Sequence, residues 1–296
     1  MTTAVDTVLY QREGAYIPRI AAVHDLCGYG KCSLGVAIPV LSAAGCDVCP
    51  VPTGLFSSHT AFPGWYMHDT TDILDDYLKA WSGINVQIDG VYSGFLGSAE
   101  QVRIIRQLYK TYPQALRVVD PVMADHGKVY PTYTPELCEA MADLACEAHI
   151  LTPNLTEAAI ILGQPIGDQW AGPSISDVEA GNMVEALLAK GAQNVVLKGI
   201  KREGENVVRN FMAGQDMDLV QVSNEYLPYM LHGTGDVYAS CLMAAVMTGK
   251  TLEQAARFAG DFTHDAMIVS SQQPDFRARG VSFELILGKV SALLSK

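Results

Sequence analysis

The sequence predicts a single α/β domain, with a central, mostly parallel sheet flanked by helices on both faces and antiparallel strands at one edge. Three observations support this fold class. Short β-branched runs alternate with longer helical patterns, which indicates βαβ units. Residues 203–221 are polar with alternating apolar positions, which is typical of an antiparallel pair. No internal repeat, low-complexity tract or long linker divides the 296 residues.

The elements follow from the periodicity of the apolar residues. Short apolar runs of β-branched residues predict strands at residues 19–24, 47–52, 90–93, 116–120, 148–152 and 194–198. Longer amphipathic or small-residue patterns predict a helix that ends at residue 43 and helices at 98–112, 134–147, 176–190, 236–248 and 252–270, with a terminal helix from residue 283. We expect residues 1–18 to form an arm and residues 19–296 to form the domain.

Composition excludes several classes of function. The chain has 32 acidic and 20 basic side chains, a net charge of −12, which argues against nucleic-acid and anionic-membrane partners. Seven cysteines do not suggest a disulfide framework, and Cys46 and Cys49, despite their CxxC spacing, flank the start of an expected strand. The N-terminus lacks the apolar core of a secretory signal, and no run is long enough to span a membrane. A cytoplasmic location is therefore expected.

The most informative motif is Gly233-Thr234-Gly235-Asp236, followed at once by a helix of small residues. Two glycines allow a tight turn with converging backbone amides, and the helix adds partial positive charge at its amino end. Such a helix start binds anions, including a phosphoryl group in transfer. Asp236 has two interpretations at this point, an ordinary helix cap or a catalytic carboxylate.

Further candidates follow the ends of expected strands, where ligands of open parallel sheets bind. Asp120, which precedes a proline, is either a turn residue or part of a cation site. In the segment TPNLTE, Asn154 or Thr152 could cap a helix with Glu157 completing a capping box. Alternatively, Asn154 and Glu157 hold a hydrated Mg²⁺.

Two loops near the N-terminus also carry polar residues. The loop that begins at Asp25 (DLCGYGK) only superficially resembles a phosphate loop, because a Walker A motif requires glycine at this position and Ser or Thr where Cys32 stands. The run SSHT, which includes His59 and Thr60, is either a solvated loop or part of a ligand site.

Read in order, these motifs resemble the ribokinase-like superfamily and, within it, the vitamin B6 (pyridoxal/pyridoxamine) kinases. The resemblance covers about residues 19–270 and is carried by the Tyr29-Gly30 turn and by the segments FSSHT, SGFLGSAEQ, DPVM, TPNLTE and GTGD. It implies a ribokinase-like domain, usually in a homodimer, that transfers the γ-phosphoryl group of ATP to the 5′-hydroxyl of a B6 vitamer.

The resemblance also implies roles for individual residues. Asp236 is expected to be the catalytic base and Gly233, Thr234 and Gly235 the anion hole. Asp120 and Glu157 are expected to hold Mg²⁺ or a monovalent cation, K⁺ or Na⁺. The residues expected to contact ATP are Asn154, Glu157 and Lys198, and those expected to contact the vitamer are Asp25, His59, Thr60 and Phe95.

Three positions depart from the family pattern. Asp25 replaces a serine, Phe95 replaces a tyrosine, and Lys198 stands where a small hydroxyl residue is common. Asp25 is interpreted either as the partner of the ring N–H⁺ or aminomethyl cation of the vitamer, or as a helix cap. Two other functions remain as alternatives: a hydroxymethylpyrimidine kinase of thiamine biosynthesis, and a catalytically silent protein that binds a B6 vitamer.

Overall fold

A computed structural model describes residues 7–167, 170 and 175–295. The described strands are β1 (Arg19–Cys27), β2 (Asp47–Phe56), β3 (Met67–Asp69), β4 (Gly90–Ser93), β5 (Leu116–Val119), β6 (Ala124–Asp125), β7 (Lys128–Val129), β8 (Ile150–Leu151), β9 (Asn194–Lys201), β10 (Val207–Gly214) and β11 (Met217–Glu225). The described α-helices are α1 (Leu34–Ala43), α2 (Thr71–Gly83), α3 (Ala99–Thr111), α4 (Pro135–Ala145), α5 (Leu155–Ile161), α6 (Asp177–Ala189), α7 (Thr234–Met247), α8 (Leu252–Ser271), α9 (Phe276–Arg279) and α10 (Gly288–Ser291).

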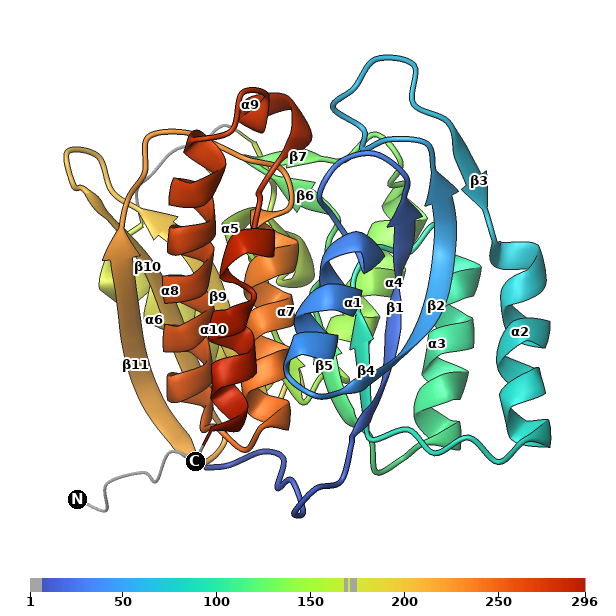
Figure 1. Cartoon of the computed structure of the whole chain (residues 1–296). Helices are drawn as coiled ribbons and strands as arrows, with labels where there is room; N and C mark the ends of the chain where they lie inside the picture. Colours follow the sequence, from blue (N-terminus) through green and yellow to red (C-terminus); the bar gives the residue numbers. More distant parts are fainter. Residues whose placement is uncertain (1–6, 168–169, 171–174, 296) are drawn as a thin grey trace.

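One large sheet organises the molecule, and its strand order within the described residues is β11-β10-β9-β8-β5-β4-β1-β2-β3. The six strands from β9 to β2 pair in parallel, whereas β3, β10 and β11 pair in antiparallel fashion at the two edges. The predicted α/β fold with antiparallel edge strands is therefore confirmed. The small β6–β7 hairpin lies near the carboxyl ends of the parallel strands (Figure 1).

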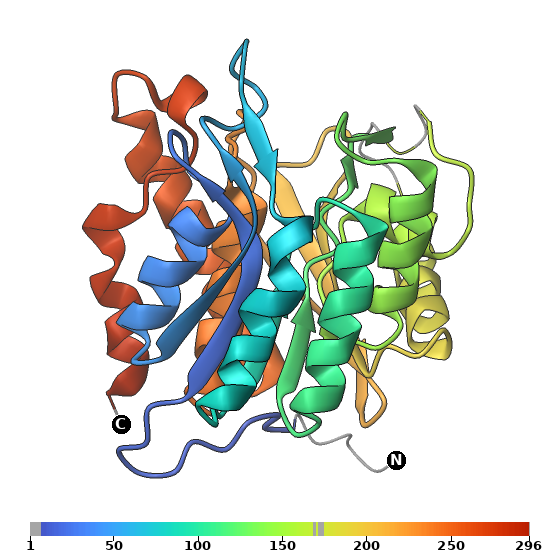
Figure 2. The same ribbon diagram turned by 90° about the vertical axis from the view of Figure 1, so that its right-hand side faces the viewer.

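Helices cover both faces of the sheet, as the sequence predicts. Helices α1, α7, α8 and α10 lie on one face and enclose one apolar core, and α2 to α6 enclose a second core on the other face (Figures 1 and 2). Helix α7 consists mostly of small residues and is buried along almost its whole length. Its packing against α1 and α8 fixes the position of its amino end, which carries the GTGD motif.

Several elements differ from the prediction. The expected terminal helix is instead a series of short pieces, Glu284–Ile286, α10 and Ala292–Leu294. Strand β2 continues to Phe56 because its last three residues pair with β3, an element that the sequence did not predict. Helix α2 was also not predicted, and Leu74 is its only buried residue.

The expected N-terminal arm lies partly outside the described residues, which begin at Thr7. Val8 forms an isolated bridge with Thr251, and the Arg12 guanidinium donates hydrogen bonds to the carbonyls of Ala44 and Gly45. These contacts attach the described part of the arm to the domain. Within the described ranges, no helix has both the length and the apolar character required to cross a bilayer.

Candidate active site

The carboxyl edge of the sheet brings together four charged residues from distant parts of the sequence. Asp25 lies in β1, Asp120 directly follows β5, Lys198 lies in β9 and Asp236 lies in the first turn of α7. The charges of Asp25, Asp120 and Lys198 all affect the pKa of Asp236, which shows that the four groups form one electrostatic cluster. The arrangement agrees with the rule that ligands of parallel sheets bind at this edge.

The amino end of α7 is formed by the GTGD motif. Gly233 is the N-cap residue and has a φ of 84°, a conformation that favours glycine. A Cβ atom on Gly233 would also overlap the carbonyl oxygen of Lys31, so the β1–α1 loop packs directly against this turn. The Thr234 hydroxyl donates to the Leu231 carbonyl and fixes the start of the helix. The first backbone amides of a helix have no partner within the helix, and a helix start of this kind can bind an anion.

Asp236 is the third residue of α7 and is not its cap. No side chain caps this helix, so the interpretation of Asp236 as an ordinary N-cap is wrong. Burial, and then the nearby carboxylates of Asp120 and Asp25, raise the pKa of Asp236 to about 7. The backbone N–H of Ser33 and the charge of Lys198 oppose this shift. A carboxyl group with a pKa near neutrality can exchange a proton with a substrate hydroxyl at physiological pH.

Asp25 is buried, with 6% of its surface exposed, and its Oδ1 accepts a 2.5 Å hydrogen bond from the Ser33 hydroxyl. Burial raises the pKa of Asp25 to about 6, although the hydrogen bond from Ser33 lowers it. Ser33, not Asp25, is the N-cap residue of α1. The interpretation of Asp25 as a helix cap is therefore wrong, and its carboxylate lies near Asp236.

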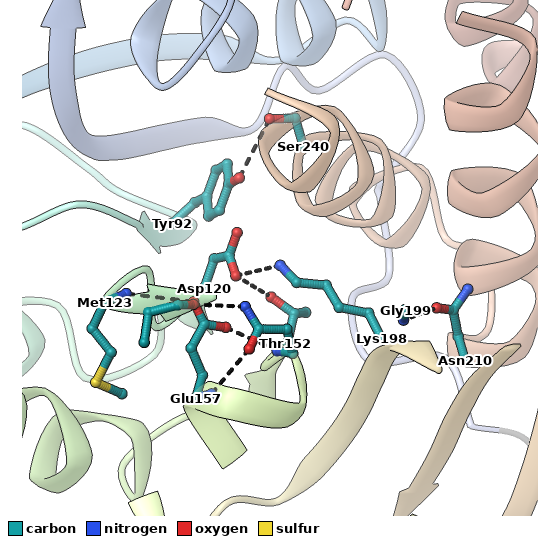
Figure 3. A network of polar contacts seen from close by, with 11 residues as sticks. Tyr92, Asp120, Met123, Thr152, Glu157, Lys198, Gly199, Asn210 and Ser240 are labelled. Atoms are coloured by element: carbon teal, nitrogen blue, oxygen red, sulfur yellow. Dashed lines mark hydrogen bonds and ion pairs between the residues drawn. The ribbon is translucent and has the colours of Figure 1, made fainter. Parts of the chain in front are cut away.

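Asp120 lies at the centre of a polar network (Figure 3). Its Oδ1 accepts hydrogen bonds from the Thr152 hydroxyl at 3.2 Å and from the Lys198 ammonium at 2.6 Å. Only 2% of the Asp120 side chain and 13% of the Lys198 side chain are exposed. A buried carboxylate requires a compensating charge, and Lys198 provides it.

Asn154 and Glu157 form the predicted capping box at the start of α5, with Asn154 as the cap rather than Thr152. Asn154 Oδ1 accepts from the Glu157 N–H at 2.9 Å, and Glu157 Oε2 accepts from the Asn154 N–H at 2.8 Å. The Asn154 amide also donates to the Ala124 carbonyl in β6. Glu157 is 2% exposed, and burial raises its pKa well above the usual range despite the opposing charge of Lys198.

The residues expected to face the vitamer lie in different surroundings. His59 is buried, its Nε2 is 2.8 Å from the Ala278 carbonyl, and its ring stacks on His232 with centroids 4.5 Å apart. Thr60 is exposed. Phe95 is 8% exposed and packs edge-on against Phe56 in the apolar core.

The sequence did not identify two residues of this region, Ser33 and His232. Ser33 donates to Asp25 and its backbone N–H lowers the pKa of Asp236, but it has a φ of 53° that no pattern of its neighbours indicates. His232 precedes the GTGD motif by one position and stacks on His59, a contact that depends on the tertiary fold. The adjacency of His232 to the motif was the only signal available.

The described residues offer few side chains grouped as metal ligands. Among the described residues, no group of three or more His, Cys, Asp or Glu side chains is arranged to hold a metal ion. All seven cysteines are free. Asp120 and Glu157 remain as a pair of carboxylates close enough to influence each other's charge.

Comparison with known proteins decides the family. The sequence model of the phosphomethylpyrimidine kinase family matches residues 39–278. The chain belongs to this family, which is part of the ribokinase-like superfamily. The matched region of this phosphomethylpyrimidine kinase family member begins in α1 and extends into α9, so it includes Asp120, Glu157, Lys198 and Asp236.

Individual relatives cover most of the chain. A pyridoxal kinase PdxY from Pasteurella multocida is 27% identical over 261 residues, which cover 84% of this family member and 87% of the relative. A protein from Bacteroides thetaiotaomicron, assigned as a phosphomethylpyrimidine kinase and crystallised with pyridoxal, is 32% identical with a TM-score of 0.87; the match covers 93% and 96% of the two chains. Pyridoxal kinase from Lactobacillus plantarum is 26% identical with a TM-score of 0.84, covering 94% and 98%.

Proposed function

We propose that this protein transfers the γ-phosphoryl group of ATP to the 5′-hydroxyl of a vitamin B6 vitamer. One observation carries the proposal: a carboxyl group with a pKa of about 7, that of Asp236, lies in the first turn of a helix whose amino end is shaped to bind an anion. A proton acceptor beside a site for phosphoryl oxygens is what phosphoryl transfer requires, and this arrangement supports that proposal. The pyridoxal kinases among the relatives support the choice of substrate.

The residues of this chain act mainly by position and charge, as phosphoryl transfer requires. Asp236 accepts the proton of the substrate hydroxyl as the hydroxyl oxygen bonds to the γ-phosphorus, while the bond from this phosphorus to the β–γ bridging oxygen breaks and ADP leaves. Gly233, Thr234 and Gly235 offer backbone N–H groups to the oxygens of the transferring group, where negative charge is concentrated. Asp25 pairs with the ring N–H⁺ or the aminomethyl cation of the vitamer, because it is a buried carboxylate close to Asp236.

Mg²⁺ fits the carboxylates at this edge. Carboxylate oxygens are the ligands that Mg²⁺ prefers, and one or two of them suffice when water and phosphate oxygens complete the shell. Asp120 and Glu157 would hold the ion, which neutralises charge on the phosphate groups. The high pKa of Glu157 is consistent with a carboxyl group that ionises when a cation is present.

The remaining predicted contacts are part of the same proposal. Asn154, the N-cap residue of α5, would contact the phosphates of ATP, as would Lys198. His59 packs beside the anion hole through its stacking on His232, and Phe95 forms apolar surroundings for the ring. The exposed Thr60 contacts the vitamer only if its loop moves on binding. We also propose a cytoplasmic homodimer, and sedimentation analysis of the purified protein tests the dimer.

The decisive experiment measures ADP release from Mg·ATP with pyridoxal, pyridoxine, pyridoxamine and hydroxymethylpyrimidine in parallel. Turnover of a B6 vitamer by the wild type, reduced about 10²-fold or more in Asp236→Ala, supports the proposal. Turnover of the pyrimidine alone would assign the protein to pyrimidine phosphorylation. Binding of pyridoxal without turnover of any substrate would favour the silent binding protein.

A further inference from the structure

The Lys198 ammonium occupies the position next to Asp120 at which a cation would bind. Its Nζ lies 2.6 Å from Asp120 Oδ1, and the Thr152 hydroxyl donates to the same oxygen (Figure 3). The two charged side chains are almost fully enclosed by protein. The ammonium is also close to Gly235, because a Cβ atom on this glycine would lie 3.7 Å from Nζ. Lys198 therefore links the buried carboxylate to the amino end of α7.

The backbone holds Lys198 firmly in this position. Its N–H donates to the Pro153 carbonyl at 2.9 Å. The next residue, Gly199, has a φ of 79° and donates its N–H to Asn210 Oδ1 at 2.9 Å. At this point the pairing of β9 with β10 shifts register between Arg209 and Phe211, as at a β-bulge. Bulges commonly redirect side chains next to active sites.

Lys198 lies among acidic side chains. Its ammonium contacts Asp120 directly at 2.6 Å, and only 13% of its side chain is exposed. Glu157 and Asp236 are close enough for their charges to act on it. One positive charge thus faces three carboxyl groups at the carboxyl edge of the sheet.

A monovalent cation does not fit beside this ammonium. Such an ion would need oxygen ligands from the same carboxylate, and Asp120 Oδ1 already accepts two hydrogen bonds. A second monovalent charge within contact distance would also be repelled by the first. The expectation that Asp120 and Glu157 hold K⁺ or Na⁺ therefore disagrees with the geometry. Mg²⁺ is repelled by the ammonium as well, but water and the negatively charged phosphate oxygens of ATP would supply most of its ligands and offset that repulsion, so that only one or two carboxylate contacts are needed.

We propose that Lys198 is a built-in replacement for the monovalent cation, so that phosphoryl transfer by this protein requires Mg·ATP but no K⁺ or Na⁺. The inference rests on the proposed kinase activity. Lys198 compensates the charge of Asp120 and adds positive potential beside the anion hole, where the transferring group gains negative charge. Because this positive charge belongs to a side chain, the site beside Asp120 stays occupied at every salt concentration.

The first test compares wild-type turnover in KCl, NaCl and tetramethylammonium chloride at constant ionic strength and saturating Mg·ATP. The tetramethylammonium ion is too large for a site built for K⁺ and serves as the control for ionic strength. The proposal expects the same kcat and KM in all three salts. Activation of the wild type by K⁺ or Na⁺ over tetramethylammonium would overturn it.

The second test removes the ammonium. Lys198→Ala leaves space beside Asp120, and we expect its turnover in tetramethylammonium chloride to fall by at least about tenfold. KCl or NH₄Cl should restore part of the loss, because a diffusible cation can then enter. Lys198→Met fills the space without charge and should not respond to either salt. Loss of activity in Lys198→Ala that neither salt relieves would contradict the proposal.

Lys201→Ala provides the matched control on the same strand. The Lys201 ammonium lies over the Tyr226 ring, 3.5 Å from its centroid, and not beside Asp120. This variant should retain wild-type turnover in every salt. A response to K⁺ in Lys201→Ala equal to that in Lys198→Ala would show that the effect is unrelated to the site.

Thermal unfolding separates this inference from the proposed function. KCl should raise the Tm of Lys198→Ala, relative to tetramethylammonium chloride, while leaving the wild type and Lys198→Met unchanged. This result can be obtained even if no substrate is turned over, in which case the kinase proposal fails and the cation replacement stands. If the wild type is active and K⁺ specifically raises its Tm, the proposal that Lys198 replaces the cation is wrong, and the kinase proposal is unaffected.

Discussion

Ser33 joins two carboxylates that are 211 positions apart in the sequence, Asp25 and Asp236. Its hydroxyl donates to Asp25 at 2.5 Å, and its backbone N–H lowers the pKa of Asp236. Its φ of 53° is unusual for serine and indicates backbone strain next to the candidate active site. Both groups of Ser33 favour the ionised forms of the carboxyl groups.

Ser33→Ala should shift the pH dependence of pyridoxamine phosphorylation. Loss of the hydroxyl raises the pKa of Asp25 above its present value of about 6, because that hydrogen bond stabilises the carboxylate. We therefore expect kcat/KM for pyridoxamine to decline near pH 6.5 and to recover near pH 8.5, relative to wild type. A uniform loss across this pH range would contradict a role through Asp25.

Asp25→Ser should discriminate between vitamers. If the carboxylate pairs with the aminomethyl cation, its loss lowers kcat/KM for pyridoxamine more than for pyridoxine. The difference should be about tenfold or more for a buried charge pair. Parallel measurement of kcat/KM for both substrates tests this. Equal losses would instead favour a contact with the ring nitrogen, which both vitamers share, or no direct contact.

The pKa of Asp236 predicts the pH dependence of the catalytic step. A general base must be ionised to accept a proton, so kcat/KM should fall about tenfold per pH unit below pH 7. A pH profile of the wild type with pyridoxine, whose side chain lacks an amine, provides the measurement. A constant rate down to pH 5 would be incompatible with Asp236 as the base.

The same pKa predicts that Asp236 reduces the stability of the fold at high pH. The pKa of Asp236 is raised from 3.8 to about 7, so its contribution to stability is present below pH 3.8 and is lost as the pH rises through 7. Asp236→Asn should therefore raise the Tm by a few degrees at pH 8, with a smaller gain at pH 5. An equal change in Tm at both pH values would indicate that the effect does not arise from ionisation.

The two glycines of the proposed anion hole should differ in their tolerance of alanine. Gly233→Ala places a Cβ on the Lys31 carbonyl and forces a positive φ, so we expect a loss of about 3 kcal/mol or more in unfolding free energy, together with activity. Gly235→Ala meets only Lys198 Nζ at 3.7 Å and should fold normally. Chemical denaturation of both variants measures their free energies of unfolding. Equal values would contradict the prediction.

The sequence was most informative where one local rule determines the structure. Strand β4 occupies the predicted residues 90–93, because a short apolar run buried on both faces has few alternatives. The ends of the strands likewise placed Asp25, Asp120 and Lys198 at one edge of the sheet. The capping box of Asn154 and Glu157 was predictable because it depends on residues only three positions apart.

Features that depend on tertiary contact were not predictable in the same way. The positive φ of Ser33 occurs beside a carboxylate that is eight positions away in the sequence, and the ion pair between Lys198 and Asp120 joins β9 to the end of β5. The terminal segment was predicted as a helix, yet Gly288 follows a 3₁₀ turn and the regular hydrogen bonding is interrupted. In each case a distant partner, or a local irregularity, outweighs the apolar pattern.

The contact of Lys31 with Gly233 also has a consequence for how the protein is made. A ribosome completes β1 and its loop early, but the turn that receives the Lys31 carbonyl emerges only after four fifths of the chain. Until α7 is synthesised and docked, the nascent chain lacks both the proposed proton acceptor and the proposed anion hole. On the proposed mechanism, a product truncated before residue 233 therefore has no means of phosphoryl transfer, and activity first arises late in synthesis.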